Sequence, residues 1–578
     1  MPGRHPAAPR TCERFTHQSL DASIDAGSDG THRAAKRRFH ERAGLGLIGI
    51  NHDALALSGR PDDLSQVDVN HNARPTLHCR FNGGLNAAMS ELELKLRIPE
   101  GALPSLRQAL RAHGAKSTRL QARYFDTADG LLARHLVALR LRLEGRRWVQ
   151  TLKAAGTGAV HRLEDEVRVS GTPGVVPQLD LHLHDGGEAG VALQAALQSE
   201  PGAVLLERHA TDITRLHCLL QTSGGTVIEV ALDTGRAMAG ANVVPITELE
   251  LEHKSGPIQG LFDLAAAWVP HGGLWLCTIT KAERGQRLMD PEGRATVAKP
   301  AMPELEVSAD GPTLLKALLQ ATLAQVLAPA SEVAEGDTAE DTIHQLRVAL
   351  RRLRTVLREL SALSATISPE WDAALAHTFG LLGQTRDQQA VTAAVQPLLQ
   401  AAGAPRLNWH APKAADPAAA VRDSAFQTTL VSILALAHAG AECFAPLSAK
   451  QVLAHLSARL RKLHGQVTRD GTRFERLPLE QQHRVRKRLK RLRYLIDLTV
   501  TLWPERAVKR YLKNLSKAQK AMGLHNDVAV AAEAFRADAA THPDAWFATG
   551  WLQAHLAVTA HSARKTLTPV AKSKKFWA

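Results

Sequence analysis

The strongest constraint on the fold is a two-residue alternation of charged and aliphatic side chains that begins at Glu91. In this first segment Glu91, Glu93 and Lys95 alternate with leucines. Successive side chains of a β-strand point to opposite faces, so the segment has one charged and one aliphatic face. The same alternation recurs in later segments, at residues 139–143, 162–168, 229–233 and 248–254. We therefore predict that residues 89–290 form an antiparallel sheet whose aliphatic face packs on interspersed helices, such as 104–113 and 257–269.

The charged faces of these predicted strands combine acids and bases, which leaves two arrangements open. The strands around Glu91 and Glu248 present mainly carboxylates, whereas residues 139–143 present Arg140 and Arg142. If the sheet closes into a barrel, these charges line its interior and form a site suited to a metal-bound polyanion. If the sheet stays open, the same charges lie on solvated strand faces.

The second half of the chain follows a different period. A chain of 578 residues is long enough for roughly two to four domains. After a Pro- and Gly-containing linker at 291–312, the hydrophobic period becomes that of helices throughout 313–578. This half contains an internal repeat, because residues 344–354 match residues 483–493. A second match follows each copy, at residues 386–387 and 526–527.

Basic residues recur in each copy of this repeat at spacings of three and four, which places them in one stripe along a helix. The stripes comprise His344, Arg347, Arg351 and Arg354 in the first copy and His483, Arg486, Lys490 and Arg493 in the second. Like charges at such spacings repel each other by about 0.2–0.5 kcal/mol per pair on one helix. Two facing stripes would raise this cost, so we predict that an anion binds between them. Two separate solvated basic faces are the alternative.

Residues 1–88 show no sustained periodicity and are rich in Arg, His, Asp, Gly and Ala, as is typical of disordered segments. Because the alternation begins directly after Met89, we hypothesise that Met89 is the natural start and that 1–88 is an over-called upstream region. A translated, disordered tail is the alternative. A peptide from residues 1–88 in the native protein would decide for the tail.

Composition restricts the partners and the location. Lys and Arg exceed Asp and Glu by 71 to 57, giving a net charge of +14, which favours anionic partners. Aromatic residues make up only 4%, which counts against single-stranded nucleic acid, because that ligand stacks on aromatic side chains. The five cysteines show no CxxC spacing, which indicates neither zinc nor a disulfide framework and favours the cytoplasm. No apolar run is predicted to cross a membrane; the longest candidate is 428–439.

The motif Glu91-Leu-Glu93-Leu-Lys95 resembles the beginning of the CYTH superfamily, the triphosphate tunnel metalloenzymes. Further matches follow in the family's order: Tyr124-Phe125-Asp126-Thr127, Arg140 with Arg142, Thr151-Leu-Lys153, Arg162 with Glu164 and Glu166, Arg208, Asp233, Glu248-Leu-Glu250-Leu-Glu252 and Lys281-Ala-Glu-Arg284-Gly. One motif alone would be a weak signal, but an ordered set is strong. The resemblance implies an α+β domain built on an eight-stranded antiparallel β-barrel that forms a tunnel.

The resemblance also implies roles for individual residues. The metal ligands would be Glu91, Glu93, Asp233, Glu248 and Glu250. The residues that hold triphosphate would be Lys95, Arg140, Arg142, Lys153, Arg208 and Lys281. The catalytic set would be Glu91, Glu93, Lys95, Glu164 and Glu166, with Glu164 or Glu166 helping to orient water. These types suit the chemistry, since Arg and Lys bind phosphate oxygens, and Mg²⁺ or Mn²⁺ takes carboxylate ligands and polarises a phosphoryl group.

The helical half resembles the CHAD domain, a helical module often fused behind CYTH. This resemblance implies an all-α bundle that binds inorganic polyphosphate through the two basic stripes. One departure from the family pattern lies in the first copy, where Asp387 is followed by Gln388 and Gln389 instead of a second aspartate. That puts a metal or ion-pair role of this copy in doubt, whereas the second copy keeps Asn526-Asp527.

Taken together, the two resemblances imply a metal-dependent inorganic triphosphatase that cleaves tripolyphosphate to diphosphate and phosphate, with a C-terminal polyphosphate-binding domain. The expected location is the cytoplasm, with polyphosphate granules as a further site. Adenylate cyclase and thiamine triphosphatase share the barrel and are the enzymatic alternatives. A non-catalytic polyphosphate-binding protein is another alternative, disfavoured by the full set of tunnel acids. Nucleic-acid binding through the basic helices predicts DNA affinity that survives added polyphosphate; we expect polyphosphate to displace DNA.

Overall fold

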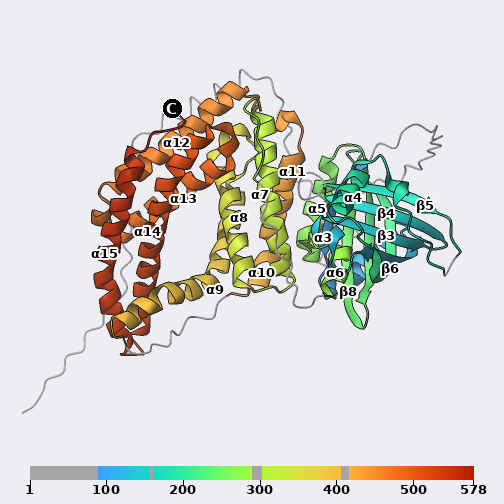
Figure 1. The fold of residues 1–578 in the computed structure, drawn as a ribbon, viewed down its shortest axis with the longest axis horizontal. Coiled ribbons are helices and arrows are strands. Elements are labelled where there is room, and N and C mark those ends of the chain that lie inside the picture. The colour runs from blue at the N-terminus through green and yellow to red at the C-terminus, as the bar shows by residue number, and fades with distance from the viewer. Residues whose placement is uncertain (1–88, 156–160, 173–174, 290–301, 405–414, 578) are drawn as a thin grey trace, which may run out of the picture. The chain divides into compact units, whose positions relative to one another are not determined.

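The computed structural model describes residues 89–155, 161–172, 175–289, 302–404 and 415–577. A strand-rich region is followed by a helical one, as the change of period predicted (Figure 1). The predictions for residues 1–88, and for the first half of the linker at 291–312, lie outside the described residues.

The strand-rich region is an antiparallel, tunnel-like sheet with the order β5-β4-β3-β2-β6-β7-β8-β1-β9. Its strands are β1 (Met89–Arg97), β2 (Lys116–Asp126), β3 (Val137–Glu144), β4 (Arg147–Ala155), β5 (His161–Val169), β6 (Leu206–Gln221), β7 (Val227–Ala239), β8 (Asn242–Ser255) and β9 (Trp275–Leu276). The start of β1 also pairs with β5, from Met89 opposite Glu164 to Leu92 opposite His161. This short seam joins the two ends of the eight-strand order, and β9 adds a two-residue strand beside β1. The predicted fold class is therefore confirmed.

Short helices lie between these strands. They are α2 (Leu103–Ala112), α3 (Leu131–Arg134), α4 (Glu188–Ser199), α5 (Gln259–Gly272) and α6 (Lys281–Arg287), with 3₁₀ turns η3 (Glu100–Ala102) and η4 (Leu181–His184). The aliphatic face of β1 packs against them, because Leu94 and Leu96 share a buried cluster with Leu106 of α2 and Phe262 of α5. Burying the aliphatic face outside leaves the charged face for the interior.

The helical region contains nine α-helices among the residues described. They are α7 (Gly311–Ala334), α8 (Glu340–Glu359), α9 (Pro369–Ala401), α10 (Pro417–Arg422), α11 (Ser424–His438), α12 (Ala449–Gly471), α13 (Leu479–Leu498), α14 (Glu505–Asp538) and α15 (Ala545–Lys572). The 3₁₀ turns η5 (Ser361–Leu363), η6 (Ala441–Cys443), η7 (Phe474–Arg476) and η8 (Val500–Leu502) connect them. Helix α8 is amphipathic, and its Leu346, Leu350 and Leu353 are fully buried. The residues of the predicted basic stripe lie on the same helix and are interspersed in sequence with these buried leucines.

The described residues belong to one compact unit, and one hydrophobic cluster runs through both regions. The packing of α11 against α5 and β9 forms part of this contact. The backbone N–H of Leu276 donates to Oε1 of Gln427 at 2.9 Å, and the guanidinium of Arg422 lies 4.5 Å from the centre of the Trp275 ring. The strand-rich region is therefore held to the helical region by side-chain contacts as well as by the chain.

Helix α7 is long and apolar enough to cross a membrane, with a mean hydropathy of 1.2 over the tested window. Of that window, 61% is buried inside the protein, as in the core helix of a folded domain. From the sequence, the shorter run at 428–439 was predicted to be the longest apolar segment, and that prediction was wrong. It overlooked α7 because Lys316 and several polar residues interrupt its leucines.

Candidate active site

Strand register brings charged side chains from four strands to one patch of the tunnel wall. Lys95 on β1 is the partner of Glu250 on β8, and Glu248 on β8 is the partner of Asp233 on β7. Asp233 in turn faces Arg215 on β6. These residues alternate with buried aliphatic neighbours, so their side chains point together to the interior.

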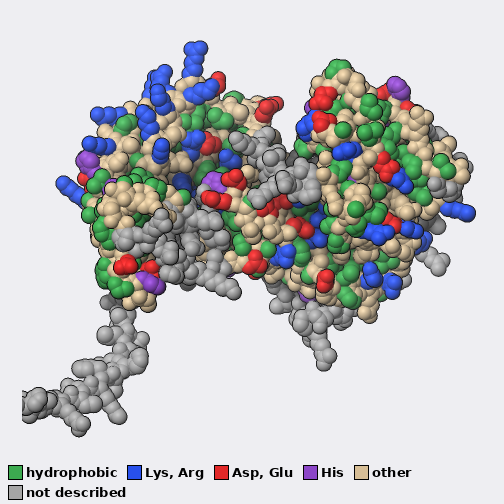
Figure 2. Space-filling view, turned by 60° about the horizontal axis from the view of Figure 1, so that its bottom comes forward, with side chains coloured by type: hydrophobic (Ala, Val, Ile, Leu, Met, Phe, Trp, Pro, Cys, Tyr) green, Lys and Arg blue, Asp and Glu red, His purple; other side chains and the backbone are tan. Residues whose placement is uncertain are grey.

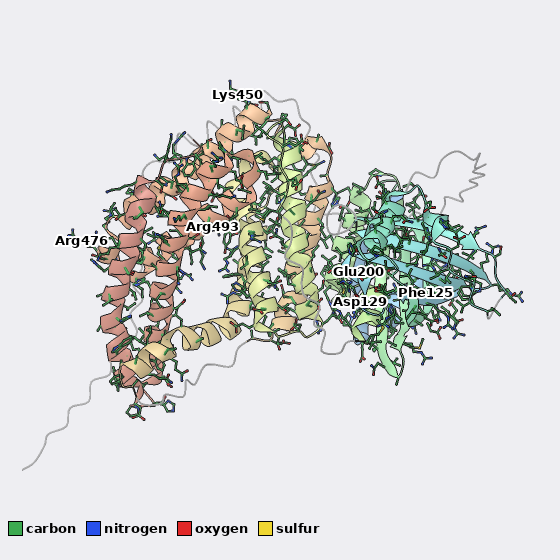
Figure 3. All side chains as sticks on the ribbon, viewed as in Figure 1. Phe125, Asp129, Glu200, Lys450, Arg476 and Arg493 are labelled. Atoms are coloured by element: carbon green, nitrogen blue, oxygen red, sulfur yellow. The ribbon has the colours of Figure 1, made fainter. Side chains whose placement is uncertain are left out.

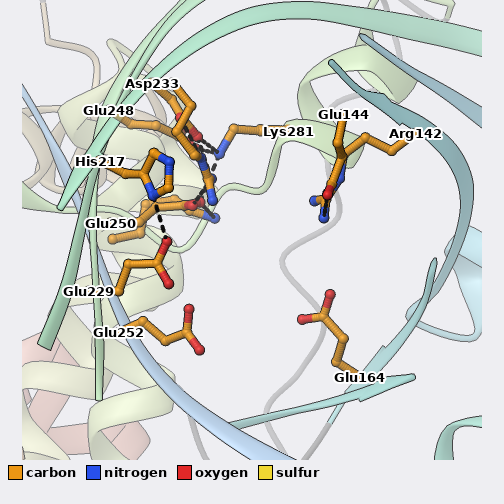
Figure 4. A network of polar contacts seen from close by, with 12 residues as sticks. Arg142, Glu144, Glu164, His217, Glu229, Asp233, Glu248, Glu250, Glu252 and Lys281 are labelled. Atoms are coloured by element: carbon orange, nitrogen blue, oxygen red, sulfur yellow. Dashed lines mark hydrogen bonds and ion pairs between the residues drawn. The ribbon is translucent and has the colours of Figure 1, made fainter. Parts of the chain in front are cut away.

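Three carboxylates meet at this patch. Asp233, Glu248 and Glu250 each offer one oxygen, and the three oxygens lie within 4.8 Å of one another. The ammonium of Lys281, the first residue of α6, lies among them: its Nζ is 2.8 Å from Asp233 and 2.7 Å from Glu250, and it also contacts Glu248 (Figure 4). The structure thus brings together three of the five predicted metal ligands and one predicted substrate-binding lysine.

Arg215 completes this group, although the predicted site did not include it. Its Nε and Nη2 donate to the two oxygens of Asp233 at 2.8 and 2.7 Å, and Nη2 also contacts Glu250. Its position opposite Asp233 could not be predicted, because the pairing register of β6 with β7 is a tertiary property.

Mutual attraction keeps these groups charged. Burial alone would raise the pKa of Glu250, but Lys281, Arg215 and Lys95 hold that pKa well below its usual range. The same two cations, Lys281 and Arg215, lower the pKa of Asp233 against the effect of burial. Burial alone would lower the pKa of Lys281, whereas the three carboxylates raise it well above its usual range. The patch is therefore a preformed, charged site.

The donor set fits a divalent cation. Hard cations such as Mg²⁺ and Mn²⁺ prefer carboxylate oxygens, and three lie within reach of one ion. One further observation supports the fit: among the described residues, Oε2 of Glu248 is buried and accepts no hydrogen bond. A buried carboxylate oxygen of this kind is costly unless something binds it.

The two predicted ligands on β1 are placed less closely. The side chain of Glu91 lies outside the described residues, and only its backbone pairing with β5 is known. Glu93 is the register partner of Glu252, one alternation away from Glu250. Burial lowers the pKa of Lys95, but Glu248, Glu93 and Glu250 together raise it. Glu93 therefore lies near the patch, and its role as a ligand stays a prediction.

A second charged patch lies on strands β3, β4 and β5. The guanidinium of Arg140 lies 3.8 Å from Glu164 and 3.7 Å from Glu166, and Arg142 lies 2.9 Å from Glu166. Lys153 contacts Glu164. Figure 4 shows Arg142 and Glu164 across the interior from Glu250 and Lys281. The predicted phosphate-binding residues and carboxylates of this wall are thus paired with one another and face the acidic patch.

Burial and neighbouring charges of both signs set the pKa values of this wall. Burial would lower the pKa of Arg140, but Tyr124 and Glu164 raise it. Burial and the neighbouring Arg140 lower the pKa of Arg142. Burial alone would raise the pKa of Tyr124, but the charge and the hydrogen bond of Arg140 lower it overall. An anion placed here would relieve the repulsion between the two arginines.

The predicted phosphate ligand Arg208 is placed differently from the others. A β-bulge interrupts the pairing of β2 with β6 at this point, since Tyr124 faces His209 and Phe125 faces Glu207. The Nη2 of Arg208 donates to the carbonyl oxygen of Ala128 at 3.0 Å. Bulges redirect side chains in a way that strict alternation does not predict. No described contact joins Arg208 to the acidic patch.

A further row of polar groups lies one register step from the acidic patch. Glu229 and Glu252 are cross-strand partners, and His217 lies 3.3 Å from Glu229 (Figure 4). Burial raises the pKa of Glu252, and Glu229 and Glu93 add to this against the effect of Lys254. The sequence left Glu252 outside the predicted metal ligands, and it lies outside the three-carboxylate group here too.

The two predicted basic stripes lie on α8 and α13, and these helices pack against each other. The guanidinium of Arg351 lies 5.5 Å from the Phe379 ring and 5.9 Å from the Tyr494 ring, the latter on α13. Burial, Arg486, Arg351 and Arg347 lower the pKa of Lys490 to about 6, although Asp527 opposes them. Cations from both copies therefore act on one lysine, as facing stripes require.

The outer members of the stripes are neutralised by acids. Arg354 donates to Asp372 at 2.9 Å, and Arg493 donates to both oxygens of Asp497 at 2.9 Å. Figure 3 shows Arg493 among the helices and Arg476 at the periphery. Burial and neighbouring cations lower the pKa of His483, and His344 is half-buried on α8.

The departure in the first copy, and the matching residues of the second copy, can be placed only in part. The side chains of Asp387 and its neighbours lie outside the described residues. In the second copy, Asp527 acts electrostatically on Lys490. Lys and Arg side chains also gather elsewhere over the helical region (Figure 2), so positive charge is not confined to the two stripes.

The protein thus has two parts: a tunnel-like β-domain with a carboxylate patch facing a basic wall, and helices with an internal basic cluster. Comparison with known families gives the same division. The chain contains a CYTH domain at residues 89–285, followed by a CHAD domain at residues 317–536.

Similar proteins extend the comparison. The chain is 30% identical over 213 residues to the inorganic triphosphatase of Haemophilus influenzae, a match that covers 35% of this chain and 56% of that protein. It is 22% identical to the CHAD domain structure from Ricinus communis, covering 46% of this chain and 95% of that one, with a TM-score of 0.38. It is 19% identical to an adenylyl cyclase candidate from Hippeastrum reported to have a dominant triphosphatase activity, covering 32% and 89%, with a TM-score of 0.22. The structural likenesses are too low to carry a functional argument.

Proposed function

We propose that this protein is a metal-dependent inorganic triphosphatase that cleaves tripolyphosphate into diphosphate and phosphate. One observation carries the proposal: three carboxylates, two of them fully buried, lie within 4.8 Å of one another and face a wall of arginines across the same interior. The similarity to an inorganic triphosphatase supports it, although the match spans about half of that enzyme.

The residues divide the work in a simple way. Asp233, Glu248 and Glu250 would hold Mg²⁺ or Mn²⁺, which supplies charge neutralisation and polarisation of a phosphoryl oxygen. Arg140 and Arg142 bind phosphate oxygens, with a planar guanidinium suited to two oxygens at once.

Lysines and carboxylates of the tunnel position the substrate. Lys95 and Lys153 add donors on either wall, and Lys281 holds its charge at the acidic patch. Glu164 and Glu166 remain candidates for orienting the attacking water. Catalysis in such a site is mostly positioning and electrostatic stabilisation of charge on the transferred phosphoryl group.

A catalytic site is favoured over a purely binding one. Pure anion binding does not need three clustered carboxylates. Oε2 of Glu248 is buried and accepts no hydrogen bond among the described residues, a cost that a bound cation would offset. Two of the three carboxylates, Asp233 and Glu248, are 0% exposed.

A substrate panel tests the proposal. Phosphate release is measured for tripolyphosphate, thiamine triphosphate, ATP and long-chain polyphosphate, each with Mg²⁺ and with Mn²⁺. We expect tripolyphosphate to be turned over fastest. Cyclic AMP formed from ATP would establish the cyclase alternative, and no turnover of any substrate would establish a binding protein.

We further propose that the helical region binds inorganic polyphosphate between α8 and α13, which would keep the protein in the cytoplasm or at polyphosphate granules. The support is the mutual action of Arg347, Arg351 and Arg486 on Lys490. The variant Arg347→Ala with Arg486→Ala should weaken polyphosphate binding in a filter assay and leave tripolyphosphate turnover nearly unchanged.

The matched control is Arg484→Ala, which removes an exposed arginine of α13 paired with Glu480. It should leave polyphosphate binding intact. Equal loss in both variants would mean that overall charge, not the α8–α13 cluster, holds the anion. DNA that remains bound in the presence of polyphosphate would favour the nucleic-acid alternative.

A further inference from the structure

Glu335, where α7 ends, lies between two arginines of the CYTH domain. Its Oε1 accepts a hydrogen bond from Nε of Arg97 at 2.8 Å, and its Oε2 accepts one from Nη1 of Arg284 at 3.2 Å. Burial alone would raise the pKa of Glu335, but Arg284 and Arg97 lower it. One carboxylate of the helical region therefore joins two segments of the strand-rich region.

Each of these arginines belongs to a segment that carries a lysine of the proposed site. Arg97 follows Lys95 by two residues on β1, on the same face of the strand. Arg284 follows Lys281 on the short helix α6. Both lysines reach the same carboxylate, since Lys95 lies 3.5 Å and Lys281 lies 2.7 Å from Glu250. The Arg97–Glu335–Arg284 bridge thus fixes the two lysine-bearing segments relative to each other.

Helix α6 needs such external support. It spans only Lys281–Arg287, and a helix this short is marginal without tertiary contacts. A second ion pair, between Arg287 and Glu332 on the last turn of α7, holds its other end at 2.9 Å. The backbone N–H and Oγ1 of Thr278, which precedes α6, lie 2.9 and 3.2 Å from Oγ of Ser331. Helix α6 therefore packs against the C-terminal end of α7, and these contacts hold it in place.

We infer that Glu335 is a positioning residue for Lys281 and Lys95, so that the helical region completes the triphosphate site. This inference rests on the proposed function and adds a residue from outside the CYTH domain. Glu335 touches neither substrate nor metal ligands. It acts through Arg284 and Arg97, which donate hydrogen bonds to Glu335. Both arginines also lie beside the acidic patch, since Arg97 is the register partner of Glu248 and Glu248 acts electrostatically on Arg284.

The test compares full-length wild type with Glu335→Gln, Arg284→Gln and the double variant. We expect Glu335→Gln to lower kcat/KM for tripolyphosphate by between about 10- and 100-fold, the range for a small misplacement of binding groups. The double variant should lose no more than the stronger single variant, because both break the same bridge. Glu335→Asp, which keeps the charge, should recover part of the loss. Losses that multiply, or a Glu335→Gln protein with wild-type kcat and KM, would overturn the inference.

The control is Glu359→Gln, which alters another buried carboxylate that holds two arginines, Arg459 and Arg491, but lies wholly within the helical region. It should change the melting temperature and not kcat/KM. If Glu359→Gln lowers kcat/KM as Glu335→Gln does, the effect is general destabilisation and the inference fails.

A second readout separates this inference from the proposed function. Acetylation of Lys281 is followed by mass spectrometry, with exposed Lys450 as the internal reference. Lys281 is buried and charged in the wild type and should be protected, and Glu335→Gln should remove that protection. An inactive wild type with this change would refute the proposed function alone. Unchanged protection of Lys281 would refute the positioning role, whatever the activity.

Discussion

Lys490 should take up a proton when polyphosphate binds. Burial and the cations Arg486, Arg351 and Arg347 lower its pKa from 10.5 to about 6 in the free protein. At pH 7.5 a group with this pKa is charged in only about 3% of molecules. A polyanion between α8 and α13 reverses the repulsion, so the pKa rises and the ammonium forms.

The size and sign of the effect follow from proton linkage. Because the bound state holds more protons than the free state between the two pKa values, affinity falls as pH rises. If each bound polyphosphate segment is accompanied by uptake of one proton, the Kd for polyphosphate increases about tenfold per pH unit above pH 7. The dependence flattens below about pH 6, where Lys490 is already charged in the free protein.

Calorimetry measures this uptake directly. Titrations of polyphosphate into the protein at pH 7.5, in two buffers with different ionisation enthalpies, should differ by close to about one ionisation enthalpy per bound segment. Lys490→Met should abolish the difference, and Lys487→Met, which alters an exposed neighbour on α13, should not. Equal heats in both buffers for the wild type would refute the reasoning.

Two further predictions concern a tightly packed glycine and a buried carboxylate. In Gly285→Ala the added Cβ would lie 1.9 Å from the His209 ring, so α6 must shift. We expect this variant to lose about 1–3 kcal/mol of stability in denaturant unfolding and to release phosphate from tripolyphosphate more slowly. The control is Gly380→Ala, because an added Cβ meets open space there. A Gly285→Ala protein with wild-type turnover would contradict the role given to α6. Glu359→Gln removes the charge of a buried carboxylate that faces Arg459 and Arg491, and should cost on the order of 3 kcal/mol in unfolding free energy. An unfolding free energy unchanged by Glu359→Gln would mean that water effectively solvates Glu359 and its two arginines.

Much of the fold could be predicted because its signals are local. The alternation at Glu91, Glu93 and Lys95 depends only on strand geometry, and the change of period at 313 depends only on helix geometry. The basic stripes on α8 and α13 were visible for the same reason. The ordered motifs then indicated which sheet the strands form, since spacing alone left both an open sheet with solvated charges and a closed barrel possible.

The rest could not be predicted because it depends on tertiary register. Arg215 belongs to the acidic patch only because β6 pairs with β7 in the observed register, and a bulge between β2 and β6 interrupts the strict alternation next to Arg208. Arg354 belongs to a predicted stripe, but Asp372 on α9 neutralises it through a contact between two helices. The pair of Arg493 with Asp497 is local, four residues apart on α13, and was not predicted although the sequence contains it. The bridge through Glu335 joins residues more than 50 positions apart, and no local pattern marks it.

The central claim is that the carboxylates inside the tunnel carry out triphosphate hydrolysis. Two aspartates make a matched comparison, because each accepts two hydrogen bonds from one arginine. Asp233 is paired in this way with Arg215 inside the tunnel, and Asp212 with the exposed Arg119. The measurement is the initial rate of phosphate release from tripolyphosphate with Mg²⁺. We predict that Asp233→Asn loses at least about 100-fold, as removal of a metal ligand should, whereas Asp212→Asn keeps the wild-type rate. Equal rates for the two variants would contradict the account.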